Sequence, residues 1–411
     1  MSTRAVQLLG PRFRRLWAAS VVSGVGDGML FSAVPLLAVR YTQYPLTVAL
    51  TVMAERLPYF ALALPAGVLV DRRDPRRLMI QMDIFRGVVV GALAIALLSS
   101  RGSLGVLVVA VLLLASGSTV FTAAAQTVLP AVVGAGALGR ANTRLNLAET
   151  VSVLTIGPAA GALLFSAAAA LPFTADAVSF VLSAVLLAGI AGSYRGSRSL
   201  EDTSVPAPLP GRVGAEIREG LGWLVRSPPM RSLALVLSGL SGMQAAVVGT
   251  QVLYATRTLH LPAAGYGLLL AVSAAGSLLA GLLPIPETWY TPRLLAVGIV
   301  IASIGCLVMA TAPGGIVAAG GLLIVNFGVS LGRITMLTIG QRLTPPPLLG
   351  RVLGAVRTMS GAGILLGTLL GGYLAQRFGL RAPFTVTAVT YLGIVVVYLA
   401  SNRARSRRAD G

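Results

Sequence analysis

The sequence is dominated by apolar stretches that are long enough to cross a lipid bilayer as helices. A transmembrane helix needs about 20 predominantly apolar residues to span the hydrocarbon core. Twelve such stretches lie at about 16–39, 45–70, 78–99, 104–128, 145–170, 173–194, 231–254, 265–285, 292–312, 315–338, 352–374 and 383–401. Only 11% of the residues are charged, against about 25% in a soluble domain, so most of the outer surface must face lipid.

The distribution of arginine predicts how these spans are oriented. All 32 basic residues are arginine. If both ends of the chain are cytoplasmic, 23 arginines fall in cytoplasmic segments and 5 in outer loops. This bias follows the positive-inside rule, so we expect an even number of spans in a bacterial inner membrane. It also explains the net charge of +19 without a nucleic-acid partner, which would need a basic face on a soluble domain.

Several kinds of active centre are excluded by residues that are scarce or missing. Without lysine the chain cannot form the phosphate-binding loop of P-loop NTPases. The single cysteine, Cys306, rules out an internal disulfide and a two-cysteine metal site, and the single histidine, His260, lies in a loop segment without a polar cluster. We therefore expect no cofactor, no metal and no hydrolase. Residues 11–15 lead into a span too long for a signal-peptide core, so we expect no cleaved leader.

The second half of the chain repeats the first. Leu-Gly-Arg at 138–140 recurs at 349–351, and Pro-Phe-Thr at 172–174 recurs at 383–385, both at an offset of 211 residues. We therefore predict an all-α membrane protein with twelve spans in two six-helix halves related by pseudo-two-fold symmetry. The predicted parts are a bundle at 1–194, a cytoplasmic linker at 195–230 with a short amphipathic helix near 216–221, a second bundle at 231–402 and a basic cytoplasmic tail at 403–411.

The loop between the second and third spans carries an acidic and basic motif. Residues 67–77 read Gly-Val-Leu-Val-Asp-Arg-Arg-Asp-Pro-Arg-Arg, which resembles a loop signature of the major facilitator superfamily. Asp71 can face a helix N-terminus and a cationic partner, and such a contact would hold the inward side shut. The alternative is that the arginines only orient the protein. The predicted cytoplasmic gate comprises Gly67, Asp71, Arg72 and Arg76, with Asp83 and Arg86 one turn apart as a gate or structural pair.

The fifth span contains a second motif, Gly157, Pro158 and Gly161. It resembles the core of the antiporter signature in drug exporters of the same superfamily, and the alternative is simple close packing of small residues. Residues 13–17, 26–28, 57–58, 64–67 and 350–352 are similar to the branch that contains macrolide-efflux and enterobactin-exporter-like permeases. That resemblance implies the major facilitator fold and export of an amphipathic small molecule coupled to protons.

Five acidic residues lie inside predicted spans, and all five belong to the first half: Asp27, Glu55, Asp83, Glu149 and Asp176. A charge at the bilayer midplane costs about 2.5–3.5 kcal/mol on insertion scales, so it usually has a partner or a use. Burial favours the neutral form of a carboxyl group, which lets it load and release a proton. We predict Asp27, flanked by three glycines, as the leading proton-coupling residue, followed by Glu55 and Glu149. The alternative is a structural ion pair with Arg56 or Arg86.

The predicted substrate cavity is large and apolar, with a few polar side chains. Its predicted lining residues are Phe31, Tyr59, Gln244, Asn326 and Met359, together with Met243, Gln251 and Met336. The alternative for each is ordinary helix packing or contact with lipid, because periodicity does not separate the two in helices that are apolar all round.

The sequence as a whole predicts a secondary active transporter that works by alternating access. The favoured function is export of a drug, antibiotic or siderophore-like molecule in exchange for protons. A proton symporter that imports a solute uses the same scaffold and is the alternative, and a membrane scaffold is a third interpretation. The expected partners are a small-molecule substrate, protons and the lipid bilayer, and we expect a monomer.

Overall fold

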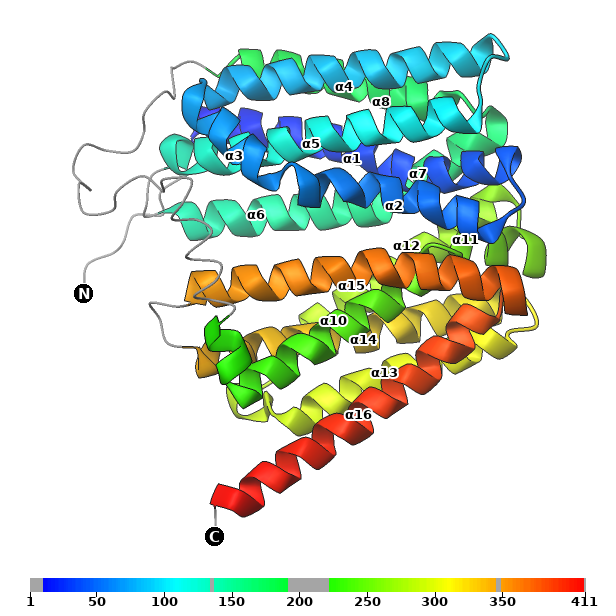
Figure 1. Cartoon of the computed structure of the whole chain (residues 1–411). Coiled ribbons are helices and arrows are strands. Elements are labelled where there is room, and N and C mark those ends of the chain that lie inside the picture. The colour runs from blue at the N-terminus through cyan, green and yellow to red at the C-terminus, as the bar shows by residue number, and fades with distance from the viewer. Residues whose placement is uncertain (1–9, 134–136, 191–221, 345–348, 410–411) are drawn as a thin grey trace. The chain divides into compact units, whose positions relative to one another are not determined.

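The computed structural model describes residues 10–133, 137–190, 222–344 and 349–409, and regular structure in these ranges is helical. Figure 1 traces the helices along the chain. Residues 195–221 of the predicted linker, including its short amphipathic helix, lie outside the described ranges. The last helix, α16 (Ala382–Ala409), continues into the segment that was predicted as a basic tail.

Eleven helices in the described ranges are long and apolar enough to cross a membrane, and a bent pair brings the number to twelve. The pair is α2 (Pro45–Ala61) and α3 (Ala63–Arg72), which bend by 54° at the break before Pro65. Proline lacks a backbone donor and clashes with the preceding turn, which explains the bend. The prediction of an all-α membrane protein with twelve spans is confirmed.

The chain forms two compact units. Residues 1–42, 54–203 and 262–271 bound the first unit, and residues 43–53, 204–261 and 272–411 bound the second. The start of α2 therefore groups with the second unit and the start of α12 (Ala263–Leu282) with the first. The domain boundaries proposed from the sequence, 1–194 and 231–402, remain predictions.

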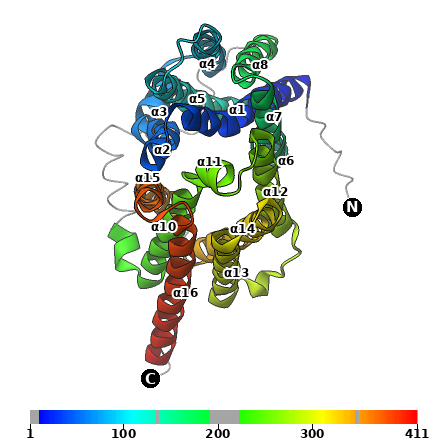
Figure 2. The ribbon, with the colours of Figure 1, turned by 90° about the vertical axis from the view of Figure 1, so that its right-hand side faces the viewer.

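In the first unit, α1 packs against α7 and α8, and α4 packs against both α5 and α8. Figure 2, an end-on view, has α4 and α8 side by side. Besides α3 and the π-helical turn Ser152–Ile156, the helices that lie wholly in this unit are α1 (Pro11–Tyr41), α4 (Pro75–Leu98), α5 (Leu104–Val133), α6 (Leu138–Val151), α7 (Gly157–Ala167) and α8 (Leu171–Ala188).

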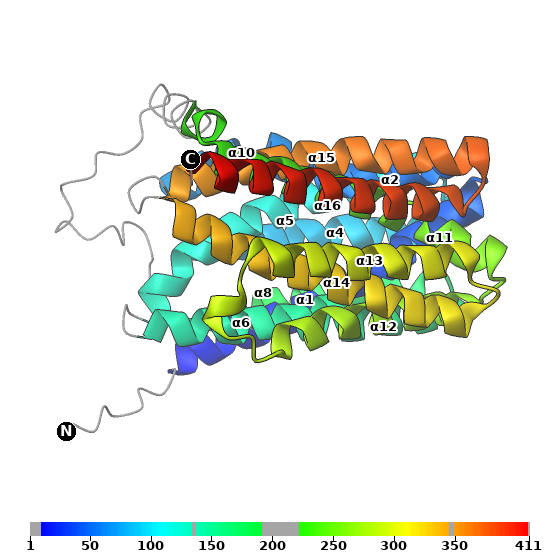
Figure 3. The same ribbon diagram turned by 90° about the horizontal axis from the view of Figure 1, so that it is seen from below.

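In the second unit, α13 packs against α14 and α16, and α10 packs against α15. Figure 3 has α13 and α14 running alongside each other. The long helices of this unit are α10 (Pro228–Val248), α13 (Pro292–Thr311), α14 (Gly315–Leu343), α15 (Leu349–Phe378) and α16.

Helix starts repeat between the two halves of the chain. Pro11 and Pro228 open α1 and α10, and Pro75 and Pro292 open α4 and α13, both pairs 217 residues apart. The starts of α5 and α14, of α6 and α15, and of α8 and α16 are each 211 residues apart. Proline suits the first helical position because no intrahelical partner exists there for its missing N–H. These offsets relate each position of the first half to one position of the second.

Candidate functional site

A cavity of about 500 Å³ opens within the first unit, between α1, α2, α4, α5 and α6. Its wall carries the charged residues Asp27, Glu55, Arg56, Arg86 and Glu149. Aromatic and amide side chains complete the polar and apolar lining, among them Phe31, Tyr59, Phe121, Gln126, Asn142 and Asn146. The structure therefore brings together all three predicted proton-coupling residues and two of the predicted substrate-lining residues.

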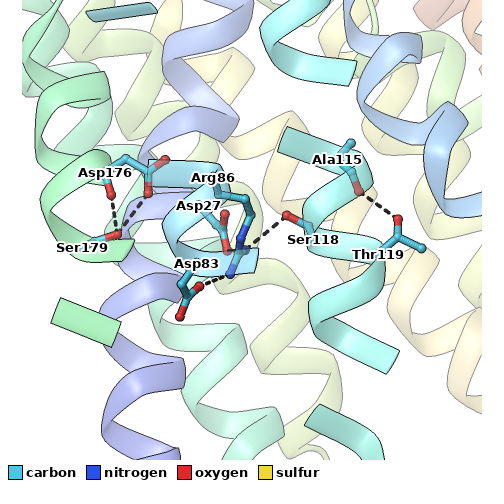
Figure 4. A network of polar contacts seen from close by, with 8 residues as sticks. All are labelled: Asp27, Asp83, Arg86, Ala115, Ser118, Thr119, Asp176 and Ser179. Atoms are coloured by element: carbon cyan, nitrogen blue, oxygen red, sulfur yellow. Dashed lines mark hydrogen bonds and ion pairs between the residues drawn. The ribbon is translucent and has the colours of Figure 1, made fainter. Parts of the chain in front are cut away.

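Arg86 of α4 is the centre of a buried ionic network at the base of this cavity (Figure 4). Its side chain is 1% exposed and pairs with Asp83, one turn earlier on the same helix. It also donates to the Ser118 hydroxyl of α5 at 3.2 Å. The rings of Phe121 and Phe180 hold the guanidinium carbon at 4.4 and 4.2 Å from their centroids. Two cation–π contacts, an ion pair and a hydrogen bond fix this cation in place.

Asp27 of α1 connects the network to the cavity. Its carboxylate oxygen Oδ2 lies 3.6 Å from Nη1 of Arg86, and its side chain is 36% exposed. Asp83, in contrast, is completely buried. Arg86 thus stands between one carboxylate that faces the cavity and another that does not. A proton that reaches Asp27 from the cavity would leave Arg86 with Asp83 as its ionic partner.

Close helix packing makes the room for this network. A methyl group at Gly117 of α5 would lie 2.9 Å from Cγ of Arg86. On α1, a side chain at Gly28 would lie 2.8 Å from the backbone oxygens of Ser152 and Val153. These glycines explain why the polar groups of neighbouring helices can meet inside the membrane.

The fifth-span motif lies at the closest part of this crossing. Gly157 faces Gly28, and Gly161 faces the backbone of Met29. The turn before the motif, Ser152–Ile156, is π-helical and closes with the Gly157 N–H on the Ser152 carbonyl. Pro158 explains this wider turn. Proline has no N–H to donate, and its ring would clash with the carbonyl group of the preceding turn in a normal α-helix. Packing of α1 on this span is thus one use of the motif, and its role in antiport remains a prediction.

The gate motif lies at the N-terminal end of α4, before Asp83 and Arg86 in the middle of the same helix. Asp74 accepts a hydrogen bond from the Arg77 N–H at 3.1 Å and caps α4. Arg76 donates to the Leu187 carbonyl at 3.0 Å and to the Ala188 carbonyl, at the end of α8. An arginine at a helix C-terminus donates hydrogen bonds to the unpaired carbonyl groups there, and its charge interacts favourably with the negative end of the helix dipole. Arg76 therefore ties the loop to α8.

The remaining gate residues make fewer contacts. Asp71 and Arg72 are exposed, and among the described residues Asp71 has no ion pair within 4.0 Å. A methyl group at Gly67 would meet no atom within 4 Å. Asp83 and Arg86 form the predicted pair, but the pair belongs to the cavity network. A gating role for any of these residues remains a prediction.

Three predicted lining residues belong to the second unit. Gln244 is partly buried, and its side-chain oxygen has no hydrogen-bond partner in the described part of the chain. Asn326 donates to the Leu322 carbonyl of its own helix at 3.0 Å. Met359 packs against the core of the second unit, as do the more deeply buried Met243 and Met336. Gln251 is 4% exposed. A substrate-binding role for these residues remains a prediction.

Sequence reasoning did not select Asp176 of α8 as a site residue. It is completely buried and lies beside the Asp27–Arg86 pair in Figure 4. Two signals were available: it is one of the five acids inside predicted spans, and Gly26 precedes Asp27 at the point where α1 meets α8. A methyl group at Gly26 would overlap the Asp176 carboxylate and lie 3.0 Å from Cβ of Ser179.

A helical membrane protein with a charged cavity in one bundle has the architecture of a secondary transporter. The chain belongs to the Major Facilitator Superfamily, whose family model matches residues 16–368. It is accordingly a multi-pass membrane transporter and not an enzyme.

Similar proteins cover nearly its whole length. It is 27% identical to the multidrug efflux pump Tap of Mycolicibacterium fortuitum, over 95% of this chain and 96% of that protein. It is 21% identical to macrolide efflux protein A of Streptococcus pyogenes, over 96% of both chains. Among solved structures, the nucleoside transporter NupG matches with a TM-score of 0.75 at 10% identity, over 95% of this chain and 99% of that one. A likeness at this identity supports the fold alone.

Proposed function

We propose that this transporter exports an amphipathic small molecule in exchange for protons, with Asp27 as the proton-binding residue. The observation that carries the proposal is the position of Asp27. Its carboxylate faces the cavity on one side and a buried guanidinium, 3.6 Å away, on the other. Proton binding at Asp27 therefore changes both the charge of the cavity wall and the partners of Arg86. Glu55 and Glu149 on the same wall are the next candidates.

The surroundings of Asp27 support reversible proton binding rather than a permanent negative charge on this residue. A carboxyl group in a low-dielectric site takes up a proton more readily than one in water, while a neighbouring guanidinium favours its charged form. The two effects oppose each other at Asp27, so a modest change in the distance to Arg86 changes its occupancy. One proton moving through 100 mV releases about 2.3 kcal/mol, which sustains a substrate gradient of about fifty-fold.

The composition of the cavity supports a cationic amphiphile as substrate. Three carboxyl groups face it against two guanidinium groups, and Arg86 is already engaged by Asp83. Phe31, Tyr59 and Phe121 supply aromatic surface, which suits an apolar or cationic ring system. The two relatives named above are called multidrug and macrolide efflux proteins, in agreement with export of such compounds.

Transport in proteoliposomes tests the proposal. Purified protein is reconstituted, an acidic interior is imposed, and uptake of ethidium or erythromycin is followed. We expect wild type to accumulate at least one of the two, and Asp27→Asn to accumulate neither. Glu287→Gln is the matched control, because Glu287 is an exposed acid of a loop outside the cavity. Full accumulation by Asp27→Asn would remove Asp27 from the mechanism, and accumulation with protons moving in the same direction would favour the importer.

We further propose a bacterial cell-membrane location with both termini in the cytoplasm. The support is the arginine bias and the bacterial origin of the relatives. Cysteine accessibility tests it: with the buried Cys306 as the only native thiol, single cysteines placed at residues 3 and 411 should react with an impermeant reagent only after the membrane is opened. Labelling of one of them in intact cells would contradict this topology.

A further inference from the structure

Asp176 is a buried carboxyl group without a cationic partner of its own. Its side chain is 0% exposed, and its oxygen Oδ1 accepts a hydrogen bond from the Ser179 hydroxyl at 3.0 Å. Its other oxygen, Oδ2, has no hydrogen-bond partner among the described residues. It is not part of the cavity wall. A carboxylate in such a place is expensive when ionised, because neither water nor a cation compensates the charge.

The charges of the network favour at least one bound proton when no cationic substrate is present. Asp27, Asp83 and Arg86 are the charged groups that act on Asp176 from the helices packed against α8. Arg86 contacts both Asp27 and Asp83, so three carboxyl groups share one guanidinium. Full ionisation without a bound cation would leave two negative charges uncompensated in a network whose Asp83 and Asp176 are completely buried. Asp176, which accepts only from a hydroxyl group, is the member least able to carry one.

The second half of the chain provides a comparison at the same position. Thr387 of α16 lies 211 residues after Asp176, in the matching Pro-Phe-Thr segment. Its hydroxyl donates to the carbonyl of Met243 on α10 at 3.3 Å. Met243 lies 217 residues after Gly26, the residue that Asp176 approaches on α1. In the second unit a neutral hydroxyl group therefore makes the polar contact at this helix crossing. The fold does not require a carboxyl group at this position.

We propose that Asp176 is a second proton-binding residue of the transport cycle, loaded and unloaded through Asp27. This inference rests on the proposed function. After Asp27 has released its own proton to the cavity, the O–H bond of the Asp176 carboxylic acid breaks and an O–H bond forms on the Asp27 carboxylate, either directly or through water. The negative charge moves from Asp27 to Asp176, and the total charge of the network is unchanged. Asp27 then releases the proton to the cavity, which Asp176 does not reach.

Gly26 lets Asp176 approach α1 next to Asp27. Because it has no side chain, the Asp176 carboxylate and the Ser179 hydroxyl can approach the α1 backbone immediately beside Asp27. Figure 4 shows the Asp176 and Asp27 side chains together with Arg86, which lies next to Asp27. Arg86 lies 3.6 Å from the Asp27 carboxylate and responds to the charge on that group.

Proton release on substrate binding tests the proposal. Purified protein in detergent and weak buffer receives ethidium or erythromycin, whichever wild type accumulates in proteoliposomes, and the released protons are counted per protein. We expect Asp176→Asn to release about half as many protons as wild type, and Asp27→Asn to release none, because the two sites titrate as a linked pair. Wild-type release from Asp176→Asn would overturn the inference. No release from wild type would overturn the proposed function instead.

Two further variants separate a proton-binding role from a structural one. Asp176→Thr copies the second half of the chain and should fold, with release reduced as in Asp176→Asn. Glu287→Gln neutralises an exposed acid outside the cavity and should release as many protons as wild type. If neither Asp176 variant folds, the infrared difference spectrum of wild type on adding the same compound decides. Loss of two carboxylic-acid bands supports the inference, and loss of a single band contradicts it.

Discussion

The two halves of the chain place different chemistry on one helical frame. The helix offsets relate Asp27 to Gln244, Asp83 to Val300, Arg86 to Ser303 and Asp176 to Thr387. Every charged member of the first-unit network has a neutral counterpart in the second. In the second unit, Ser303 donates to the Ala388 carbonyl at 2.8 Å and Thr387 donates to the Met243 carbonyl. An ion pair thus links α4 to α1 in the first unit, whereas hydroxyl–carbonyl hydrogen bonds link α16 to α13 and to α10 in the second.

This difference indicates that the helical fold does not require the charges of the first-unit network. A buried ion pair often contributes no more stability than a well-packed neutral replacement, because desolvation cancels much of the attraction. Removing one partner alone is costly. Because the buried charges are present in one half of the chain and absent from the matching positions of the other, they indicate a role in transport.

The fifth and eleventh spans differ in the same way. Pro158 in the first half corresponds to Leu369 in the second. The span that contains Pro158 has a π-helical turn at 152–156, whereas α15 continues as a regular α-helix through the matching region. Both spans nevertheless cross their partner helices at glycine, Gly157 on Gly28 and Gly367 on Gly242. Small-residue packing is common to both spans, and of these two spans only the one in the unit with the charges has a π-helical turn.

Loss of Arg86 should have the largest effect. Arg86→Ala leaves Asp83 buried without a cation, which costs about 3–5 kcal/mol, so we expect a strongly lowered unfolding temperature in detergent and poor membrane expression. The double variant Asp83→Val with Arg86→Ser copies the second half of the chain and should recover most of the stability without restoring proton coupling. Equal instability of the single and double variants would mean that the two units are not interchangeable here.

Glycine substitutions should weaken both units by similar amounts. Gly157→Ala and Gly367→Ala each push a methyl group into the backbone of the facing helix, which typically costs about 1–3 kcal/mol in a packed interior. Gly393→Ala is the control, since a methyl group there meets nothing within 4 Å. Thermal unfolding of the three variants in one detergent measures this. An unchanged unfolding temperature for Gly157→Ala would show that the two helices of the first unit can move apart at this crossing.

A hydroxyl deletion in the second unit should have a smaller effect. Tyr391 donates to the Leu240 carbonyl at 3.2 Å and is fully buried. Tyr391→Phe should lower stability by about 1 kcal/mol and leave proton-coupled accumulation of ethidium unchanged. If coupling falls while the unfolding temperature stays constant, the second unit takes part in proton transfer and the contrast between the units fails.

The smallest effect should follow from breaking an exposed pair. Arg342 and Glu287 lie 3.5 Å apart, and their side chains are 46% and 92% exposed. Such a pair is worth about 0–1 kcal/mol because water screens it. Arg342→Ala should therefore leave the unfolding temperature and transport within experimental error of wild type. A clear loss of stability would show that this arginine also supports α14 by its hydrogen bond to the Glu287 carbonyl.

Much of the fold could be predicted from the sequence, because apolar length and arginine placement act over whole helices. The repeat between residues 138–140 and 349–351 even predicts the matching starts of α6 and α15. The break in the second span was not predicted, although Pro58 and Pro65 marked it. Whether a proline bends a span or is absorbed depends on neighbouring helices, and periodicity carries no information about them.

The candidate site was predicted in part. Asp27, Glu55 and Glu149 were selected because charge is costly in a membrane, and they share one cavity. Asp176 was not selected, because its importance lies in having Gly26 as a neighbour and no cation of its own. Pairing across three helices depends on rotation of each helix about its axis. In a chain that is apolar on all faces, the sequence pattern does not fix that rotation.

The separation of substrate movement from proton movement in Asp27→Asn tests the mechanism as a whole. Proteoliposomes are loaded with unlabelled substrate, and exchange with labelled erythromycin is followed at equal pH on both sides and again with an imposed pH gradient. We expect Asp27→Asn to exchange substrate as wild type does but to gain nothing from the gradient, while wild type accumulates label. Gradient-driven accumulation by this variant, at the wild-type level, would contradict proton coupling through the first unit.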